Sequence, residues 1–280
     1  MPVQIITDSS TDLAPDFRPK PEVLPLTIHF DSQSFLDGVE LSHRGFYERL
    51  VESDQLPTTS QATPYAFAQA FARARQAGRQ VVAITISAKL SGTYQSAVLA
   101  AEEFPEDVFV VDSHSVTIGA GILVEYATAL AQSGLSAREI AQAVERERDK
   151  VQLVALLDTL EYLKRGGRIS KTVALAGSLL SIKPVVSLNQ GEVELLGKAR
   201  GSRQGNNMLV QRIAAAGGVD FSRPVLLGYT GLSDALLQKY IQDSKALWAG
   251  QVDSLPVTTV GGAVGTHVGP GAIAVAFFRP

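Results

Sequence analysis

Residues 90–97 read Leu-Ser-Gly-Thr-Tyr-Gln-Ser-Ala, and the segments on either side of them decide the fold. Before them, residues 81–86 form a short apolar, β-branched block that predicts a buried parallel strand. After them, apolar side chains between Tyr94 and Ala101 recur at helical spacing, which predicts a helix with one buried face. The Ser-Gly-Thr step at 91–93 therefore lies in a strand-to-helix turn.

The turn formed by Ser91, Gly92 and Thr93 has the chemistry of an anion site. Free backbone N–H groups and the positive end of the helix dipole favour an anion at a helix N-terminus. Two hydroxyls and a glycine suit a carboxylate or phosphate oxygen held by neutral donors. The alternative is that Ser91 only caps the helix, since Ser is a favoured cap in any protein.

Hydroxyl-rich turns follow two other predicted strands. Residues 3–6 lead into Thr-Asp-Ser-Ser-Thr-Asp at 7–12, and residues 108–111 lead into Asp-Ser-His-Ser. A further cluster, Thr-Thr-Ser-Gln at 58–61, precedes a Thr-Pro helix start. The carboxyl ends of parallel strands meet at one sheet edge, where ligands bind in open α/β folds. We therefore expect these turns to surround a ligand.

Composition excludes several classes of protein. The chain has 280 residues, 45% of them apolar, no cysteine and a net charge of −3. The zero cysteine count excludes a disulfide framework and thiolate sites and fits a cytoplasmic protein. The charge gives no general attraction to nucleic acid. No apolar run reaches the ~20 residues of a membrane span, and the N-terminus does not resemble a signal peptide.

The first half of the chain alternates strands and helices, which predicts a mostly parallel sheet with helices on both faces. Pro25 predicts an edge position or a bulge for its strand. The expected strands are 3–7, 23–30, 81–87 and 108–112, and the expected helices are 43–53, 64–77, 93–103, 116–133 and 137–150.

The second half mixes antiparallel with parallel pairing, because a hairpin turn is predicted at 189–191. We expect an N-terminal α/β domain at 1–152, a C-terminal mixed α/β domain at 153–280, and a ligand in the cleft between them. The expected strands of this half are 153–157, 183–188, 192–200, 224–230, 252–259 and 272–278, and the expected helices are 203–215 and 233–248.

Nucleotide and metal motifs are incomplete. The segment 166–172 lacks the glycines of a phosphate-binding loop, and the Gly-Ala-Gly at 119–121 lacks the third glycine of a dinucleotide fingerprint. No metal site is predicted, because the four histidines (His29, His43, His114 and His267) are scattered without a ligand spacing. His267 differs from the others, because it lies in a predicted glycine-rich turn at 265–271.

A serine hydrolase is one alternative, since Ser91, His267 and Asp112 are available as a triad. However, no Gly-x-Ser-x-Gly elbow surrounds the serine. A basic diglycine segment, 164–168, predicts a helix C-terminus in which Arg168 lies beyond the glycine cap and is free to reach a ligand or partner.

Taken together, these segments resemble the DegV family of fatty-acid-binding proteins, which serve as the lipid-carrying subunit of bacterial fatty acid kinase. The two longest matches are highly specific, and the matches span nearly the whole chain in order. They are 7–13, Leu36-Asp37-Gly38, Thr59-Ser60-Gln61, 90–97, 158–170, Ile182-Lys183-Pro184 and 265–271.

The resemblance implies two α/β domains with one long-chain fatty acid, of the palmitate class, between them. It implies that Thr59 and Ser91 bind the carboxylate, with Arg168, Arg200 and His267 as further head-group or partner contacts. Within the same motifs, Ser60, Gly92 and Thr93 are secondary candidates. It implies no cofactor and no catalytic residue of the chain's own.

The implied partner is a separate ATP-binding kinase subunit that converts the presented carboxylate to an acyl phosphate for phospholipid synthesis. An acyltransferase that accepts the acyl phosphate is a further implied partner, and lipid exchange allows a transient membrane contact. A stand-alone fatty acid carrier or sensor is the other alternative to the hydrolase.

Overall fold

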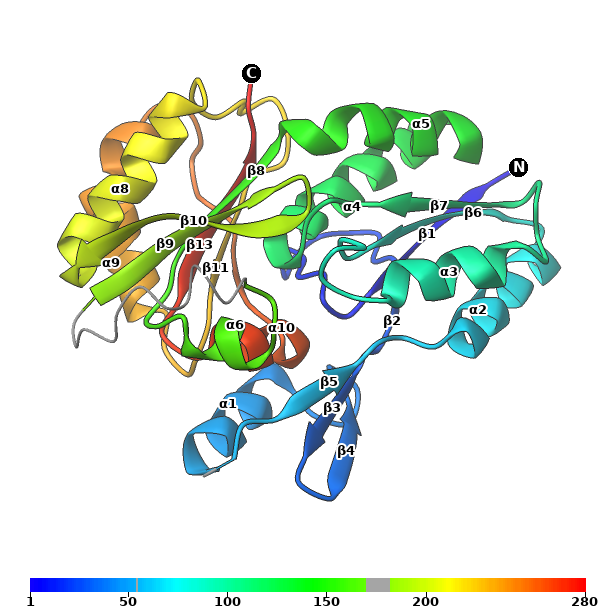
Figure 1. The fold of residues 1–280 in the computed structure, drawn as a ribbon. Helices are drawn as coiled ribbons and strands as arrows, with labels where there is room; N and C mark the ends of the chain where they lie inside the picture. Colours follow the sequence, from blue (N-terminus) through cyan, green and yellow to red (C-terminus); the bar gives the residue numbers. More distant parts are fainter. Residues whose placement is uncertain (54, 170–181) are drawn as a thin grey trace.

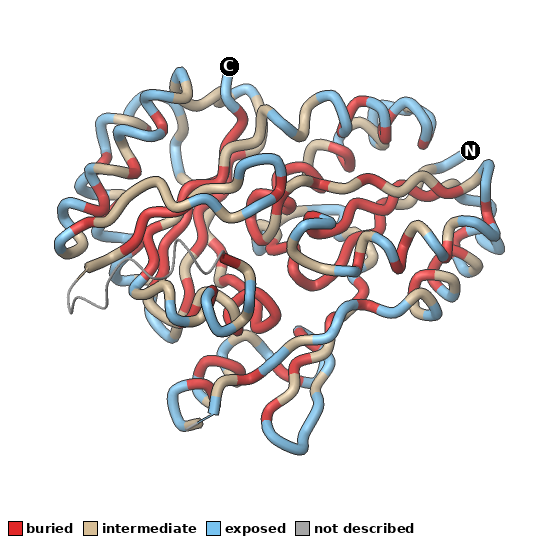
Figure 2. Tube along the Cα trace, in the orientation of Figure 1, coloured by how far each residue is buried: buried red, intermediate tan, exposed pale blue. Residues whose placement is uncertain are grey.

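The computed structural model describes residues 1–53, 55–169 and 182–280, which form two large lobes and a small third unit (Figure 1). Each lobe is built on its own sheet, and the central strands, such as β6 (Gln80–Thr85) and β13 (Ile273–Phe278), are largely buried (Figure 2). Within the described residues, no helix is long and apolar enough to cross a membrane.

The first sheet is parallel throughout and has the strand order β2-β1-β6-β7. Its helices lie on both faces. Neighbouring residues of β1 show this, since Ile5 packs with α4 and α5 on one face and Ile6 packs with α2 and α3 on the other. The predicted α/β layer is thus confirmed. The elements are β1 (Val3–Asp8), β2 (Glu22–Leu24), α2 (Pro64–Gln76), β6 (Gln80–Thr85), α3 (Thr93–Ala101), β7 (Val108–Asp112), α4 (Thr117–Gln132) and α5 (Ala137–Glu147).

The second sheet is mixed and has the order β10-β9-β8-β13-β11-β12. Helices α8 and α9 cover one face, while α4 of the first lobe packs against the other. The predicted domain boundary at 152 falls inside β8, whose pairing partners all belong to this sheet. The elements are β8 (Val151–Leu156), α6 (Glu161–Arg165), β9 (Ile182–Asn189), β10 (Glu192–Arg200), α8 (Gly201–Ala215), β11 (Leu226–Tyr229), α9 (Ala235–Asp243), β12 (Val257–Thr259) and β13 (Ile273–Phe278).

A small third unit consists of the antiparallel sheet β4-β3-β5 and helix α1. The prediction of one strand over 23–30 is wrong, because the chain leaves the first sheet at Pro25 and enters this unit. A proline cannot donate to a sheet ladder, and β2 is indeed an edge strand. The elements are β3 (Thr27–Phe30), β4 (Gln33–Leu36), α1 (His43–Glu52) and β5 (Thr58–Ser60).

Helix α10 (Gly262–Val268) lies where the two lobes and the third unit meet (Figure 1). The prediction of a turn over 265–271 is wrong for its first half, which is helical. The glycines of this segment lower its helix propensity but allow close packing. A Cβ atom on Gly265 would lie 2.7 Å from the hydroxyl oxygen of Tyr47 on α1.

Other predicted elements are shorter in the structure. Helix α5 ends at Glu147 and continues as a 3₁₀ turn, η1 (Arg148–Lys150), and α9 is followed by a separate turn, η2 (Lys245–Leu247). Of the strand predicted at 252–259, only the last three residues are extended.

Candidate functional site

A pocket lined by both polar and apolar side chains opens at the carboxyl edge of the parallel sheet, between that sheet, β5 and α10. It encloses about 970 Å³ of space, part of which is open to solvent. The pocket brings together most of the site residues predicted from the sequence. Its lining includes Thr59, Ser60, Gln61, Ser91, Gly92, Arg168 and His267.

Thr59 and His267 form a direct contact across the pocket wall. Thr59 lies on β5 of the third unit, and His267 lies in the last turn of α10. The Nε2 atom of the imidazole is 2.9 Å from the Thr59 hydroxyl oxygen. The two residues are therefore one hydrogen-bonded group rather than separate ligand contacts.

The environment of His267 keeps its imidazole neutral. Burial and, to a smaller extent, the nearby positive charge of Arg168 lower the pKa of His267 to about 4. Its Nδ1 atom is buried and has no hydrogen-bond partner. Gly166, the C-cap of α6, packs directly on this atom, since a Cβ there would lie 2.2 Å from Nδ1. At neutral pH the ring therefore offers one N–H and one lone pair.

Ser91 lies at the start of α3 and is half-buried. Its hydroxyl oxygen accepts the backbone N–H of Thr93 at 3.2 Å and is 2.9 Å from the Thr93 hydroxyl. The N-cap role considered for Ser91 is wrong, because Gly92 is the N-cap and α3 has no side-chain capping hydrogen bond. Ser91 also lines the pocket, so its bond to the N–H of Thr93 is compatible with ligand binding. Thr93 itself is fully buried and is not among the lining residues.

The glycine of this turn makes room for a neighbouring amide. A Cβ atom on Gly92 would lie 2.1 Å from the side-chain oxygen of Gln61, whose nitrogen donates to Ser96 at 2.8 Å. Ser60, next to Gln61, is exposed, and its hydroxyl is 2.7 Å from Nε2 of His29. Ser60 thus borders the pocket, but its hydroxyl is already hydrogen-bonded to His29.

The two predicted arginines are placed very differently. Arg168 lines the pocket and donates to the carbonyl of Leu90 at 3.2 Å and to that of Gly166 at 2.5 Å, so it joins the Ser91 turn to α6. Arg200 is exposed at the far end of β10, seven residues from the lining residue Val193, which is about 23 Å along a strand. The structure does not bring Arg200 to this pocket. Ser170, the last residue of the long matching segment, lies outside the described residues.

The other predicted hydroxyl turns do meet at the sheet edge, but most of their hydroxyls bond within the protein. Thr7 donates to the Ile84 carbonyl at 2.7 Å, and Ser113 donates to that of Ser115 at 3.0 Å. The Ser9 hydroxyl donates to Asp37 at 2.9 Å. These three residues do not line the pocket, whereas Ser10 of the first turn does, with its hydroxyl bonded to Asp8.

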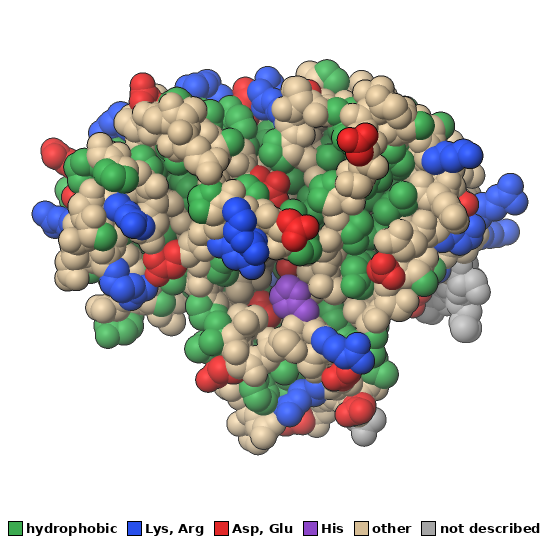
Figure 3. All heavy atoms as spheres, turned by 180° about the vertical axis from the view of Figure 1, so that it is seen from behind, with side chains coloured by type: hydrophobic (Ala, Val, Ile, Leu, Met, Phe, Trp, Pro, Cys, Tyr) green, Lys and Arg blue, Asp and Glu red, His purple; other side chains and the backbone are tan. Residues whose placement is uncertain are grey.

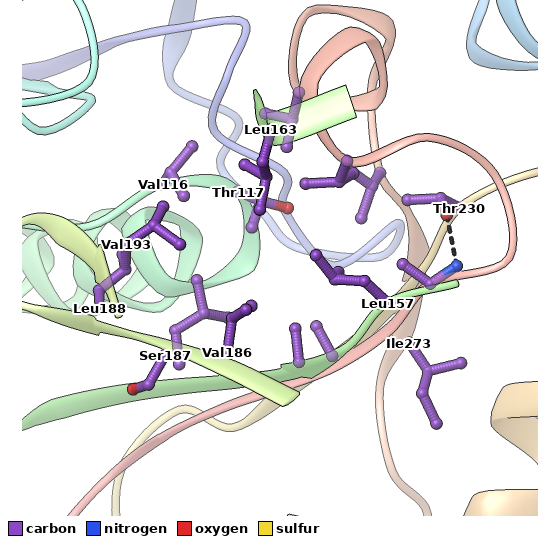
Figure 4. Close-up of a pocket in the computed structure, with 18 of the residues that line it drawn as sticks. Val116, Thr117, Leu157, Leu163, Val186, Ser187, Leu188, Val193, Thr230 and Ile273 are labelled. Carbon is purple, nitrogen blue, oxygen red and sulfur yellow. Dashed lines mark hydrogen bonds between the residues drawn. The ribbon is translucent and has the colours of Figure 1, made fainter. Parts of the chain in front are cut away.

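Next to this pocket lies an apolar cavity with about 560 Å³ of space, part of which is open to solvent (Figure 4). Its lining residues come from strands of the second sheet (β8, β9, β10, β11 and β13) and from α4, α6 and α10. The two cavities adjoin each other, because five residues line both: Val116, Leu163, Val193, Val264 and Val268.

The sequence analysis did not identify these cavity residues. They are single Val, Leu and Ala positions on many elements, and ordinary core residues give the same pattern. Of these residues, Thr117 has a recognisable position in the sequence, because it follows the hydroxyl-rich turn at 112–115. In the structure its φ is +50°, which is rare for a β-branched residue.

The geometry does not assemble the hydrolase triad. His267 bonds to Thr59 instead of Ser91, and its Nδ1 atom lacks the carboxylate that would orient it. Asp112 accepts the backbone N–H groups of Ala88 and His114. Among the described residues, no group of three or more His, Asp or Glu side chains is arranged to hold a metal ion. On the face drawn in Figure 3, basic and acidic side chains are interspersed.

The fold and the site define an α/β protein with a deep apolar cavity behind a mouth of neutral hydroxyls and one arginine. The chain belongs to the DegV family, whose model, described as uncharacterised proteins, matches residues 2–279. A DegV domain-containing protein of Deinococcus radiodurans is 37% identical over 284 residues, covering 99% of this chain and 98% of its own. One from Caldanaerobacter subterraneus is 32% identical and covers 98% of both chains.

Solved structures of the family match the whole fold. A DegV family protein of Thermus thermophilus, described for its fatty acid binding, is 33% identical, with a TM-score of 0.89 over 100% of both chains. A stearic acid-binding protein of Eubacterium ventriosum is 26% identical, with a TM-score of 0.86 over 99% of this chain and 98% of its own. The fatty acid kinase B3 protein of Streptococcus pneumoniae, loaded with linoleic acid, is 25% identical, with a TM-score of 0.86 over 100% of both chains.

Proposed function

We propose that this protein binds one long-chain fatty acid of the palmitate class, with the acyl chain in the apolar cavity and the carboxylate at Thr59 and Ser91. The observation that carries the proposal is that the apolar cavity adjoins the pocket lined by the Thr59 and Ser91 hydroxyls, with five lining residues in common. The fatty acids bound by the structural relatives support it.

The hydrogen-bond partner of Thr59 prepares its hydroxyl for a carboxylate. A threonine hydroxyl has one hydrogen to donate. If the neutral imidazole of His267 carries its hydrogen on Nε2, it donates to the Thr59 oxygen, 2.9 Å away. The Thr59 hydrogen is then free to point into the pocket. We therefore assign the Nε2–H tautomer to His267 in the complex.

The binding energy comes mainly from the acyl chain. At ~0.8 kcal/mol for each buried methylene, a C16 chain contributes on the order of 12 kcal/mol of transfer free energy. Lost translational and conformational freedom offsets much of this gain. Strong head-group contacts are therefore unnecessary, and neutral hydroxyls satisfy the carboxylate without locking it in an ion pair.

A carboxylate held in this way remains available as a nucleophile. We propose that the protein presents it to a separate ATP-binding kinase subunit, and that an acyltransferase consumes the acyl phosphate in the cytoplasm. The structural relative described as a fatty acid kinase B3 protein supports the kinase partnership. Arg168, at the pocket mouth, is placed to contact that partner or the transferred phosphoryl group. Arg200 is retained only as a candidate partner contact.

Organic extraction of the purified protein, followed by mass spectrometry, tests the proposal. We expect about one equivalent of a C16–C18 fatty acid per chain. If delipidated protein fails to take up palmitate, the proposal is wrong. Labelling of Ser91 by a fluorophosphonate, with partner-independent ester cleavage, would instead establish the hydrolase.

A further inference from the structure

Two buried carboxylates of the N-terminal half hold the beginning of helix α10. Asp12, in the turn after β1, accepts the backbone N–H of Gly261 at 2.8 Å. Asp37, after β4, accepts those of Gly262 at 3.1 Å and Ala263 at 3.2 Å. These contacts span about 250 and 225 positions of sequence, and they bond the unpaired N–H groups that every helix has at its start.

The same two carboxylates are tied to other parts of the fold. The Thr117 hydroxyl donates to the second oxygen of Asp12 at 2.5 Å, and the Ser9 hydroxyl donates to Asp37 at 2.9 Å. Thr117 lines the apolar cavity in a left-handed conformation that costs energy for a β-branched residue. Asp12 thus links one wall of the acyl cavity to the start of α10.

Both carboxylates are buried, and burying a charged group costs free energy. Their presence here therefore argues for a specific role. Asp12 and Asp37 are buried, at 4% and 2% exposure, and burial raises the pKa of each. The facing titratable groups are Asp8 on β1 and both His43 and Tyr47 on α1. Among them only His43 can supply a positive charge, so backbone N–H groups provide much of the stabilisation. Burying a carboxylate destabilises a fold unless hydrogen bonds or an opposite charge compensate for its lost hydration.

Helix α10 carries the head-group site at its other end. It has seven residues, about 10 Å of helix, and His267 lies in its last turn. Its side chains Val264 and Val268 line both cavities. A helix this short has few bonds of its own, so contacts at its start set the position of its end.

We infer that Asp12 and Asp37 are positioning residues of the fatty acid head-group site, which act by fixing α10 so that His267 meets Thr59. The inference rests on the proposed function. A shift of the imidazole by about 1 Å is enough to lengthen a 2.9 Å hydrogen bond beyond its normal range. The Thr59 hydroxyl would then lose its orientation, and the carboxylate would lose a donor while the acyl cavity remained.

The experiment compares affinities for palmitic acid and for hexadecanol, which has the same chain without a carboxylate. Both are measured by displacement of a fluorescent fatty acid from wild type, Asp37→Ala, Asp37→Asn and Asp12→Asn. The matched control is Glu125→Ala, which removes another partly buried carboxylate that accepts a backbone N–H, here from Ala14.

We expect the ratio of acid to alcohol affinity to fall at least fivefold in Asp37→Ala, less in the two Asn variants, and not at all in Glu125→Ala. General destabilisation would lower both affinities together and leave the ratio unchanged, and that result would overturn the inference. The Asn variants keep an acceptor oxygen, so they provide the readout if Asp37→Ala does not fold. A wild type with equal affinity for both ligands would instead refute the proposed function.

Discussion

The imidazole of His267 and the hydroxyl of Thr59 meet at 2.9 Å although 208 positions of sequence separate them. This contact joins α10 to β5 of the small third unit, and both residues line the mouth of the acyl cavity. The proposed head-group site is therefore composite: its residues come together only when the second lobe, the third unit and the Ser91 turn are correctly assembled.

Removing either carboxylate donor should weaken fatty acid binding without removing it. We expect Thr59→Val and Ser91→Ala each to cost about 1–3 kcal/mol, because a buried carboxylate oxygen is left without its donor. Fluorescent fatty acid titration measures the loss. Ser60→Ala is the control, since the Ser60 hydroxyl already bonds to His29. Unchanged affinity in the Thr59 and Ser91 double variant would place the carboxylate elsewhere.

The hydrogen-bonding role of His267 predicts a difference between two substitutions. His267→Gln retains an N–H near the position of Nε2, so it should keep most of the affinity for palmitate. His267→Leu removes that donor, and the Thr59 hydroxyl loses the partner that orients it. Titration of both variants with palmitate and hexadecanol decides the matter: equal losses for acid and alcohol in His267→Leu would contradict the assigned role.

The pKa shifts of His267 and Asp12 predict opposite effects of acid on stability. The pKa of His267 is lowered to about 4, so the unfolded chain binds more protons than the folded one between about pH 4 and 6.5, and stability falls on acidification. The pKa of Asp12 is raised to about 6, so the folded chain binds more protons between about pH 4 and 6, and its stabilising contribution is lost as pH rises.

Each of these contributions is on the order of 3 kcal/mol, and in the wild type they largely offset each other. We expect Asp12→Asn to lose more stability than the wild type between pH 6.5 and 4, and His267→Gln to lose less. Urea unfolding at several pH values measures the free energy of unfolding. Parallel pH profiles for the wild type and both variants would show that the two groups do not titrate in this way.

Gly166 predicts a purely steric disturbance of the site. Its φ of −71° suits any residue, but a Cβ atom there would lie 2.2 Å from Nδ1 of His267. Gly166→Ala should therefore displace the imidazole and reduce palmitate affinity several-fold, while the backbone of the α6 C-terminus is retained. Circular dichroism and titration test this, and an NMR spectrum with an unchanged His267 ring would contradict it.

The sequence predicted the parallel lobe well because its signals are local. A β-branched block before a Ser-Gly-Thr turn, and the Thr-Pro helix start at Thr63, are sufficient to place β6 and α2. The hairpin turn also followed from local chemistry, since Gln190 and Gly191 both adopt positive φ. The third unit was missed because its strands are only three or four residues long and β5 pairs with β3 from about 30 positions away in the sequence.

The candidate site was predictable only in part, for a related reason. Thr59, Ser91, Arg168 and His267 were found because polar residues stand out in glycine-rich or hydroxyl-rich segments. The hydrogen bond between Thr59 and His267 was not predictable, because it depends on how α10 is held by Asp37 from another unit. Ordinary apolar residues such as Val193 become cavity residues only through the tertiary fold.

Filling the apolar cavity should shorten the preferred acyl chain. Ala155 lies on β8 and lines the cavity with a small side chain. Ala155→Leu adds three carbon atoms to that space, so we expect the bound lipids to shift from C16–C18 toward shorter acids. Mass spectrometry of extracted lipid measures the distribution. Ala214→Leu, at an exposed position of α8, is the control. An unchanged distribution in Ala155→Leu would move the acyl chain out of this cavity.

Arg168 should separate lipid binding from phosphoryl transfer. Its guanidinium donates to the carbonyls of Leu90 and Gly166 at the pocket mouth, whereas the carboxylate donors are the hydroxyls of Thr59 and Ser91. A cation at the mouth can stabilise the charge that develops on a phosphoryl group during transfer, and this stabilisation acts in the transition state more than in the lipid complex.

We therefore expect Arg168→Ala to reduce acyl phosphate formation with a kinase subunit at least tenfold while palmitate affinity changes less than threefold. Radiolabelled ATP measures the transfer, fluorescence titration measures the binding, and Arg165→Ala, an exposed arginine paired with Glu161, is the control. Equal losses of binding and transfer in Arg168→Ala would show that this arginine only maintains the pocket.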